Sequence, residues 1–408
     1  MKASNKHLPL VIFFEPLGEH GGLVPFDSAY CQSLAEHELD VVWVTSDETQ
    51  INSIACELWT PFQNIFGDSP SWKRGLNYAR GLWTVLKRVI SERKKRRLVI
   101  HQQFITVLPL DIIFIILLRI IGVPRVIAPH DTLPFNISRM LEGLLPTFYR
   151  QYDIIIAHSQ REIAYFQEVK NDPTAVRYIP LGNQNQEYED AASMSTFEAR
   201  VKLGLPASAP LILFLGRMRK EKGLEYLIAA LPEVLNELPD TILLVAGHPG
   251  REDFNCYENR IDKIGVRDSV RTRWEYISKD ELASFYVASN VVAVPYTQAY
   301  QSGVILTAYA FRRPVVASAV GGLVEQVQDG KTGLLIPSKD SRVLAKALLR
   351  ILNNPDLAND MGKAGHQWAA HTGNWETIAK KTVKIYRELW HKNAKNRRKN
   401  KSWKSCCS

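Results

Sequence analysis

The sequence has little cysteine: five residues in 408, with no Cys-x-x-Cys motif. A chain of this length stapled by disulfides would need more cysteines at closer spacing, which excludes a disulfide framework and favours the reducing cytoplasm. No His/Cys cluster has the spacing of metal ligands, and no Asp-x-Asp motif occurs. The sequence therefore predicts no metal site.

Long uncharged hydrophobic runs are also missing. A membrane-spanning helix needs about 20 largely uncharged residues, and the most apolar stretch, 104–121, contains Asp111 and Arg119. We expect a buried helix there, with an interfacial role as the alternative. The run Leu8–Phe14 is short for a signal peptide and predicts a first buried strand.

The remaining composition is that of a globular protein, with 46% hydrophobic and 23% charged residues. The length suggests two or three domains and provides material for two full cores. A disordered or collagen-like chain is excluded.

The net charge of +9 is concentrated in two segments. Residues 73–97 contain ten Lys/Arg and one Glu, and residues 392–404 contain seven Lys/Arg and no acid, so the rest of the chain carries −7. Such patches attract an anionic membrane surface or nucleic acid; the alternative is a solvated basic face. The tail 392–404 has almost no apolar content and is expected to be a disordered arm.

The stretch Trp72–Ile90 places apolar residues, two of them Trp, at helical spacing, with basic residues on the other faces. A basic amphipathic helix of this kind suits a membrane interface. The alternative is a helix that packs on its own domain and turns a basic face outward.

Strands alternate with helices along the chain, which predicts parallel sheets in α/β domains. Helices are expected at Leu224–Leu235 and at Ser341–Leu352, the second with Asp340 as its N-cap. A polar segment, 183–209, marks the expected domain boundary. Strands are expected at Val41–Thr45, Leu98–Ile100, Arg125–Ala128, Asp153–Ala157, Leu211–Leu215, Ile242–Ala246, Val291–Val294, Val315–Ala317 and Leu334–Ile336.

The strand Leu211–Leu215 leads into Gly216, Arg217 and then Lys222, just before a helix. Ligands of open α/β sheets bind outside the carboxyl ends of the strands. An Arg fork and a Lys point charge at that place suit a diphosphate. A surface loop that happens to be basic is the alternative.

A second segment strengthens the diphosphate interpretation. Ser302 and Gly303 are placed to open a helix whose first backbone N–H groups face an anion. Gly321 and Gly322 permit close backbone approach after the next strand.

These segments together resemble the family 4 retaining glycosyltransferases, over about residues 8–390 and most densely in 211–337. The matching motifs are Gly216-Arg217…Glu221-Lys222-Gly223, Pro314–Glu325 with Asp329-Gly330…Gly333, Gly21-Gly22, Ala128-Pro-His130-Asp131, Ser159 and Ile179-Pro-Leu-Gly182. The resemblance implies the GT-B fold, an α/β architecture of two Rossmann-like domains facing across a cleft, with a C-terminal helix crossing back to the first domain. The implied domains are 1–190 on the acceptor side with 375–392 packed on it, 200–374 as the donor domain, and 393–408 as a disordered tail.

The same resemblance implies the site residues. His130, Arg217 and Lys222 are the implied catalytic residues, with His130 lining the sugar site and the two cations stabilising the leaving diphosphate. The implied donor-binding set is Gly21, Gly22, Arg217, Lys222, Gln301, Ser302, Gly303, Val304 and Thr307. The family needs no metal for this role, and no cofactor other than the nucleotide-sugar donor is expected.

One departure from the family pattern concerns its pair of glutamates, which are separated by seven intervening residues. Ala299 and Thr307 stand at those positions, and a one-residue gap would bring Gln301 to the first. A subset of the family has Gln-Ser-Gly here, as in Gln301-Ser302-Gly303. The loss of this negative charge affects which donor is preferred. It also leaves open the alternative that the protein has lost catalytic activity.

The resemblance implies transfer with retention from a nucleoside diphosphate sugar to a lipid-linked, polysaccharide or other glycan acceptor at the cytoplasmic membrane face. A nucleotide-sugar-binding or scaffold protein of the same fold is the main alternative. A sugar-nucleotide epimerase would need an additional acid/base pair, which the sequence does not offer. A nucleic-acid binder would explain the basic patches, but no recognised binding module is present and the body is acidic.

Overall fold

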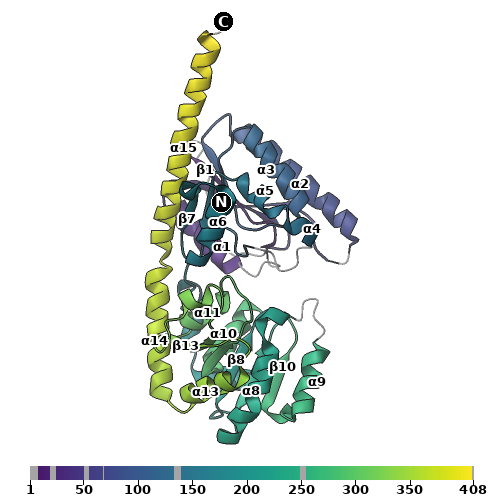
Figure 1. The fold of residues 1–408 in the computed structure, drawn as a ribbon, viewed down its shortest axis with the longest axis vertical. Coiled ribbons are helices and arrows are strands. Elements are labelled where there is room, and N and C mark those ends of the chain that lie inside the picture. The colour runs from purple at the N-terminus through teal and green to yellow at the C-terminus, as the bar shows by residue number, and fades with distance from the viewer. Residues whose placement is uncertain are drawn as a thin grey trace. The chain divides into compact units, whose positions relative to one another are not determined.

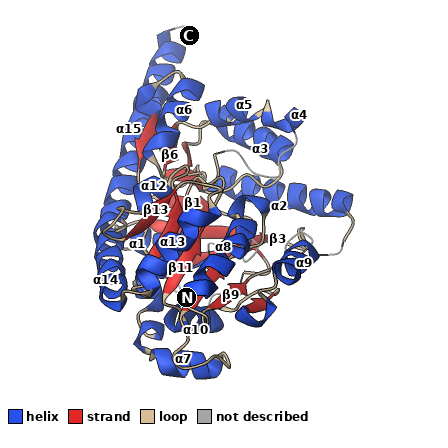
Figure 2. Cartoon of the chain, turned by 60° about the horizontal axis from the view of Figure 1, so that its bottom comes forward, coloured by secondary structure: helices blue, strands red, loops and turns tan. Residues whose placement is uncertain are grey.

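A computed structural model describes residues 8–18, 24–49, 55–67, 69–132, 139–248 and 254–406. The chain divides into two compact units. Unit 1 comprises Met1–Gly182 and Trp375–Ser408, and unit 2 comprises Asn183–Asn374 (Figure 1). Each unit has one parallel sheet whose strands lie between helices (Figure 2).

The sheet of unit 1 has the order β3-β2-β1-β4-β5-β6-β7, and every neighbouring pair is parallel. Its strands are β1 (Leu10–Phe14), β2 (Asp40–Ser46), β3 (Glu57–Phe62), β4 (Leu98–Gln102), β5 (Arg125–Ile127), β6 (Ile154–Ala157) and β7 (Val176–Tyr178). Its helices are α1 (Val24–Ala35), α2 (Ser71–Glu92), α3 (Leu108–Ile120), α4 (Arg139–Glu142), α5 (Leu145–Arg150), α6 (Gln160–Lys170) and α15 (Trp375–Cys406), with the 3-10 turn η2 (Pro173–Ala175).

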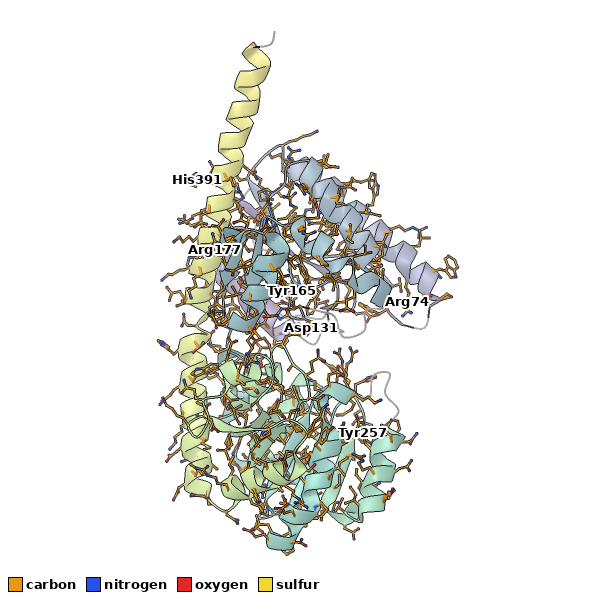
Figure 3. All side chains as sticks on the ribbon, viewed as in Figure 1. Arg74, Asp131, Tyr165, Arg177, Tyr257 and His391 are labelled. Carbon is orange, nitrogen blue, oxygen red and sulfur yellow. The ribbon has the colours of Figure 1, made fainter. Side chains whose placement is uncertain are left out.

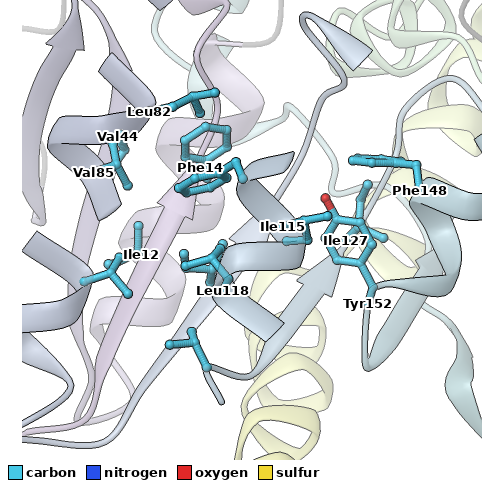
Figure 4. Close-up of a cluster of buried hydrophobic side chains, with 14 of the residues drawn as sticks. Ile12, Phe14, Val44, Leu82, Val85, Ile115, Leu118, Ile127, Phe148 and Tyr152 are labelled. Atoms are coloured by element: carbon cyan, nitrogen blue, oxygen red, sulfur yellow. The ribbon is translucent and has the colours of Figure 1, made fainter. Parts of the chain in front are cut away.

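The alternation of β1 divides the core of unit 1 into two layers, because successive strand residues point to opposite faces. Ile12 and Phe14 pack with Leu82 and Val85 of α2 and with Ile115 and Leu118 of α3 (Figure 4). The ring of Phe14 stacks on that of Phe114, with centroids 5.5 Å apart. Val11 and Phe13 face the other way, into a layer formed with α1 and α15. The C-terminal helix therefore completes the core of the N-terminal unit.

The sheet of unit 2 has the order β10-β9-β8-β11-β12-β13 and is also parallel. Its strands are β8 (Leu211–Leu215), β9 (Ile242–Ala246), β10 (Val270–Arg273), β11 (Val291–Val294), β12 (Val315–Ser318) and β13 (Gly333–Ile336). Its α-helices are α7 (Thr196–Lys202), α8 (Leu224–Glu237), α9 (Asn255–Ile264), α10 (Lys279–Ala288), α11 (Gly303–Ala310), α12 (Leu323–Gln326), α13 (Ser341–Leu352) and α14 (Pro355–Thr372). Its 3-10 turns are η3 (Gln186–Tyr188), η4 (Ala191–Ser193), η5 (Lys220–Lys222) and η6 (Arg267–Ser269).

The predicted strands and helices are confirmed. The bounds of β8, β9, β11 and α13 agree with the expected ranges, and the Asp340 side chain accepts hydrogen bonds from the backbone N–H groups of Arg342 and Val343, as an N-cap does. Three strands were not predicted: β3, β7 and β10. All three lie at sheet edges.

The expected buried helix within 104–121 is α3, and it is buried on one face only. Asp111 is accommodated because its carboxylate accepts hydrogen bonds from the Tyr78 hydroxyl and from the backbone N–H groups of Thr106 and Val107. On the opposite face, Ile113 is 56% exposed and Ile120 74% exposed.

The expected disordered arm at 392–404 is wrong, since α15 continues as a helix to Cys406. Lys, Arg and Ala have high intrinsic helix propensity, so a polar sequence can extend an existing helix without an apolar face. Among the ranges above, no helix combines the length and the apolar character needed to cross a membrane.

Candidate donor and sugar sites

The strand order places a topological switch point in unit 2 between β8 and β11. Successive connections from β8 run to one side of the sheet, to β9 and β10, and then return to β11 on the other side. Open α/β sheets bind ligands just beyond the carboxyl ends of the strands at such a point. The loops that follow β8 and β11 form this edge.

The loop after β8 holds the predicted cations. Gly216 has a φ of +129°, and the exposed Arg217 follows it at the end of the strand. Lys222 ends the turn η5, and Gly223 has a φ of +67°. A Cβ at Gly223 would lie 2.1 Å from the carbonyl oxygen of Pro295, so only glycine allows this loop to approach the one after β11.

The two loops are joined by further contacts. The backbone N–H of Thr297 donates to the carbonyl oxygen of Glu221 at 2.8 Å. The Nζ of Lys222 lies 3.9 Å from the centroid of the Tyr296 ring, a cation–π contact that orients the ammonium group. Lys222 is thus held at the carboxyl edge of the sheet by a buried aromatic ring.

The helix α11 begins beside the same edge. Ser302 is its N-cap residue, but the Ser302 side chain makes no capping hydrogen bond. A Cβ on Gly216 would lie 3.7 Å from Cγ2 of Val304, in van der Waals contact with the first turn. The first N–H groups of a helix have no partner within it, so this turn can receive an anion.

Gln326 fixes the start of α11. Its Oε1 accepts from the backbone N–H of Ser302 at 2.8 Å, and its Nε2 donates to the Ser302 carbonyl oxygen at 3.2 Å. The Ser302 hydroxyl is buried and has no hydrogen-bond partner among the described residues. The start of α11 thus contains a buried polar atom that no described group satisfies.

The two glycines after β12 serve this loop directly. A Cβ on Gly321 would lie 1.6 Å from the Ala299 carbonyl oxygen, and one on Gly322 would lie 1.9 Å from that of Tyr300. The absence of side chains at Gly321 and Gly322 thus allows residues 299–301 to pass close to the backbone of these two glycines. The half-buried Gln301 lies on this segment, before Ser302.

Thr307, at the second position of the missing glutamate pair, is buried on α11. Its hydroxyl lies 2.9 Å from the Gly303 carbonyl oxygen and also contacts the Gln184 side chain. The Thr307 hydroxyl therefore makes its hydrogen bonds to residues of unit 2 itself.

In unit 1, His130 follows β5 and is buried (Figure 3 labels its neighbour, Asp131). Its imidazole stacks between Phe104, at 5.0 Å between centroids, and His158, at 5.2 Å. Burial, together with the nearby His158 and His101, holds the pKa of His130 well below its usual value. The imidazole is therefore neutral at pH 7.

Two other family positions of unit 1 are structural or undescribed. Ser159 follows β6 and caps α6, exchanging hydrogen bonds with Glu162 in a capping box. Gly21 and Gly22 lie outside the described residues.

The structure thus brings Arg217, Lys222, Ser302, Gly303 and Val304 to one edge of unit 2, while His130 belongs to unit 1. Sequence reasoning missed Tyr296, which its position directly after β11 could have revealed. It also missed Gln326, which no local pattern marks. In the described ranges, no three His, Cys, Asp or Glu side chains are grouped so as to hold a metal ion.

The fold, with two units that each contain a parallel sheet, is that of the GT-B class. It is similar to sucrose-phosphate synthase from Thermosynechococcus elongatus, with 24% identity, a TM-score of 0.74, and coverage of 94% of this chain and 99% of the other. It is also similar to Anabaena HepE solved with UDP-glucose, with 18% identity, a TM-score of 0.73, and coverage of 94% and 100%.

The sequence pattern of the glycosyl transferases group 1 family matches residues 195–368, which lie within the second unit. The chain is also similar to a D-inositol 3-phosphate glycosyltransferase from Corynebacterium urealyticum, with 32% identity over 243 residues, which are 58% of this chain and 57% of that protein. The alignment thus spans less than two thirds of that relative.

Proposed function

We propose that the chain is a retaining glycosyltransferase that uses a nucleoside diphosphate sugar. The observation that carries this proposal is the placement of Arg217, Lys222 and the first turn of α11 at one switch point, within the segment that matches the family. Two cationic side chains and a helix N-terminus suit a diphosphate. A protein of the same fold, HepE, was solved with UDP-glucose, which supports this class of donor.

In the proposed reaction, the bond from the anomeric carbon to the diphosphate oxygen breaks, and a bond to the acceptor hydroxyl oxygen forms on the same face. The acceptor proton passes to the departing phosphate oxygen. Negative charge grows on the nucleoside diphosphate, and Arg217 with Lys222 stabilises it. We propose that these side chains do so without a metal ion.

His130 contributes to this scheme as a neutral imidazole. Because its pKa is held low by burial, it can donate or accept a hydrogen bond but carries no positive charge that would compete with Arg217 for the diphosphate. We place it at the sugar, where an uncharged polar group orients hydroxyls.

The acceptor proposal starts from the surface of unit 1. Large apolar side chains are exposed along α2 and α3, with Trp72 72% exposed and Trp83 57% exposed. Basic residues accompany them on α2, including Arg74 near its start (Figure 3) and Lys87, whose Nζ lies 5.4 Å from the Trp83 ring centroid. The apolar members of this surface are Trp72, Leu76, Trp83, Ile90, Ile113, Leu117 and Ile120.

We propose that this surface docks unit 1 on the cytoplasmic face of an anionic membrane. Exposed Trp beside Lys and Arg combines interfacial burial with attraction to anionic lipid. An acceptor presented at the membrane, lipid-linked or glycan, is then within reach. The relative named for inositol 3-phosphate makes a phosphorylated polyol the other acceptor to test.

The experiment for the donor site is a thermal-shift panel of UDP, GDP, ADP and CMP with UDP-sugars and GDP-sugars. Ligand at about 100 times its dissociation constant stabilises the fold by about 2.7 kcal/mol. We expect a shift with one nucleoside diphosphate that is lost in Arg217→Ala. No shift with any nucleotide would contradict the proposal, and binding without product formation would favour the nucleotide-sugar-binding protein instead.

The membrane proposal is tested by sedimentation with vesicles containing anionic lipid. Trp72→Ser and Trp83→Ser should weaken binding, whereas Phe197→Ser, which changes a 63% exposed aromatic residue on α7 of unit 2, should not. Equal binding of all three variants would show that α2 is only a solvated face.

A further inference from the structure

Four buried side chains of unit 1 form a continuous chain of hydrogen bonds that ends at His130. The Nε2 of His130 lies 3.1 Å from Oε1 of Gln103, and Nε2 of Gln103 lies 3.1 Å from Nε2 of His101. The Nδ1 of His101 lies 2.6 Å from the hydroxyl of Tyr386, on α15. We call these residues the His130 relay.

Strand geometry brings the relay together. His101 lies in β4 and Gln103 directly follows its last residue, so the two side chains, two residues apart, point to the same face of the sheet. On that face α1 and α15 cover the sheet, which is how Tyr386 reaches His101. The Gln103 backbone is held in line by a 3.0 Å hydrogen bond from its N–H to the Phe14 carbonyl oxygen.

The chemistry of the four groups gives the relay a direction. In the structure the Gln103 amide is oriented with Nε2 toward His101 and Oε1 toward His130, and in this orientation Nε2 donates, so His101 accepts at its own Nε2. Burial lowers the pKa of His101 to about 3, so the ring is neutral and carries its proton on Nδ1, which donates to the Tyr386 oxygen. An amide Oε1 can only accept, so His130 carries its proton on Nε2.

We propose that Gln103 is a positioning residue that fixes the tautomer of His130, with the proton on Nε2 and the lone pair on Nδ1. The relay extends this control to Tyr386 of the C-terminal helix. This inference rests on the proposed function, in which His130 faces the sugar. With its lone pair on Nδ1, His130 can only accept there, so it recognises a hydroxyl group that donates a hydrogen bond.

The stack around His130 restricts the ring further. Phe104 and His158 both stack on it, and it forms a T-shaped pair with Phe26, with centroids 5.1 Å apart and planes at 87°. The ring plane is thus set by packing, and the hydrogen bond to Gln103 selects between the two nitrogens.

The direct test is a long-range proton–nitrogen NMR spectrum of the full-length protein with nitrogen-labelled histidine. The His130 signals are assigned by their loss in His130→Phe. We expect a protonated Nε2 and an unprotonated Nδ1 in the wild type. A protonated Nδ1, or a mixture of the two tautomers, would overturn the proposal, and neither result depends on activity.

Gln103→Met removes both hydrogen bonds of the amide with little change in volume, and it should give a mixture of His130 tautomers. The matched control is Gln102→Met. Gln102 is equally buried but faces the other side of the sheet. It accepts from the Tyr152 hydroxyl and donates to the Phe104 carbonyl oxygen, and neither bond involves a histidine nitrogen. An unchanged His130 tautomer in Gln103→Met would sink the proposal. If that variant does not fold, Tyr386→Phe removes only the terminal hydroxyl and should shift the His101 signals.

Kinetics separate this role from a structural one. Gln103→Met should lower kcat/KM by about 10–100-fold, the scale known for partners that orient metal-bound histidines, while Gln102→Met stays near the wild type. A wild type with the expected tautomer but no product would contradict the proposed transfer reaction alone.

Discussion

The Cα of Gly182 lies so close to the indole of Trp375 that a Cβ at position 182 would stand 2.1 Å from Cζ2 of the ring. These residues end the first segment of unit 1 and begin its second. Trp375 also packs edge-on against Phe26, with ring centroids 5.0 Å apart, and its carbonyl oxygen accepts from the Ser33 hydroxyl. The return of the chain to unit 1 is therefore anchored at one tightly packed ring.

We expect Gly182→Ala to lower the free energy of unfolding of unit 1 by at least about 1–3 kcal/mol, the cost of overpacking, because the added methyl group meets a rigid ring. Gly75→Ala is the control: a Cβ there meets nothing within 4 Å, and alanine favours a helix, so stability should stay equal or rise. Denaturant unfolding of the two variants checks this. Equal stabilities would contradict the packing seen at Trp375.

Arg217→Ala should lower the rate of sugar transfer at least about 100-fold, the scale of losing one group that stabilises developing charge. Lys220→Ala, which removes an exposed cation from the same loop, is expected to stay near the wild type. Initial rates with a saturating donor provide the comparison. Similar losses in both variants would mean that general charge, rather than the position of Arg217, matters.

Gln326→Leu should weaken donor binding and destabilise unit 2, because it removes two hydrogen bonds that fix Ser302 at the start of α11. At about 0.5–1.5 kcal/mol for each bond, the fold loses roughly 1–3 kcal/mol. The exposed Gln328 supplies the control, Gln328→Leu. Calorimetric titration with the nucleotide found in the panel measures the effect, and unchanged affinity would remove Gln326 from the donor site.

Asp111 predicts a pH dependence of stability. Burial raises its pKa to about 7, against about 3.9 in an unfolded chain. Between these values the folded state holds a proton that the unfolded state has released, so stability falls as pH rises, by up to about 1.4 kcal/mol per unit. Asp111→Asn should lack this slope.

Unfolding of the wild type and Asp111→Asn at pH 4, 5, 6 and 7 isolates this contribution, since other titrating groups cancel in the difference. A difference that stays constant across the range would show that the three hydrogen bonds to Asp111 keep it charged.

The central strands could be predicted from sequence because burial on both faces gives them continuous apolar runs, as in β8 and β9. The edge strands β3, β7 and β10 were not predicted, because each has a neighbouring strand on one side only and is less buried. Pro61 interrupts β3, and β10 alternates Val and Thr with Arg. Hydrophobic patterns in a sequence reflect burial, and strands at the edge of a sheet are less buried than central ones.

The candidate donor site could be predicted from sequence where its residues lie on a single loop. Arg217 and Lys222 follow their strand directly, so the rule for strand ends applies. The partners that position the site could not be predicted, because they come from distant segments: Gln326 reaches back to Ser302, and Tyr386 reaches His101 from a helix at the other end of the chain. Such pairs depend on tertiary packing, which no local spacing encodes.

The interrupted course of unit 1 has a consequence for synthesis. The ribosome makes α15 only after the roughly 190 residues of unit 2, which takes about 10–40 s at 5–20 residues per second. Until then Val11, Phe13, Val99 and Val126 lack the helix that covers their face of the sheet. A nascent chain that exposes this apolar face is expected to bind chaperones. Unit 2 is one uninterrupted segment, so it can finish folding before unit 1.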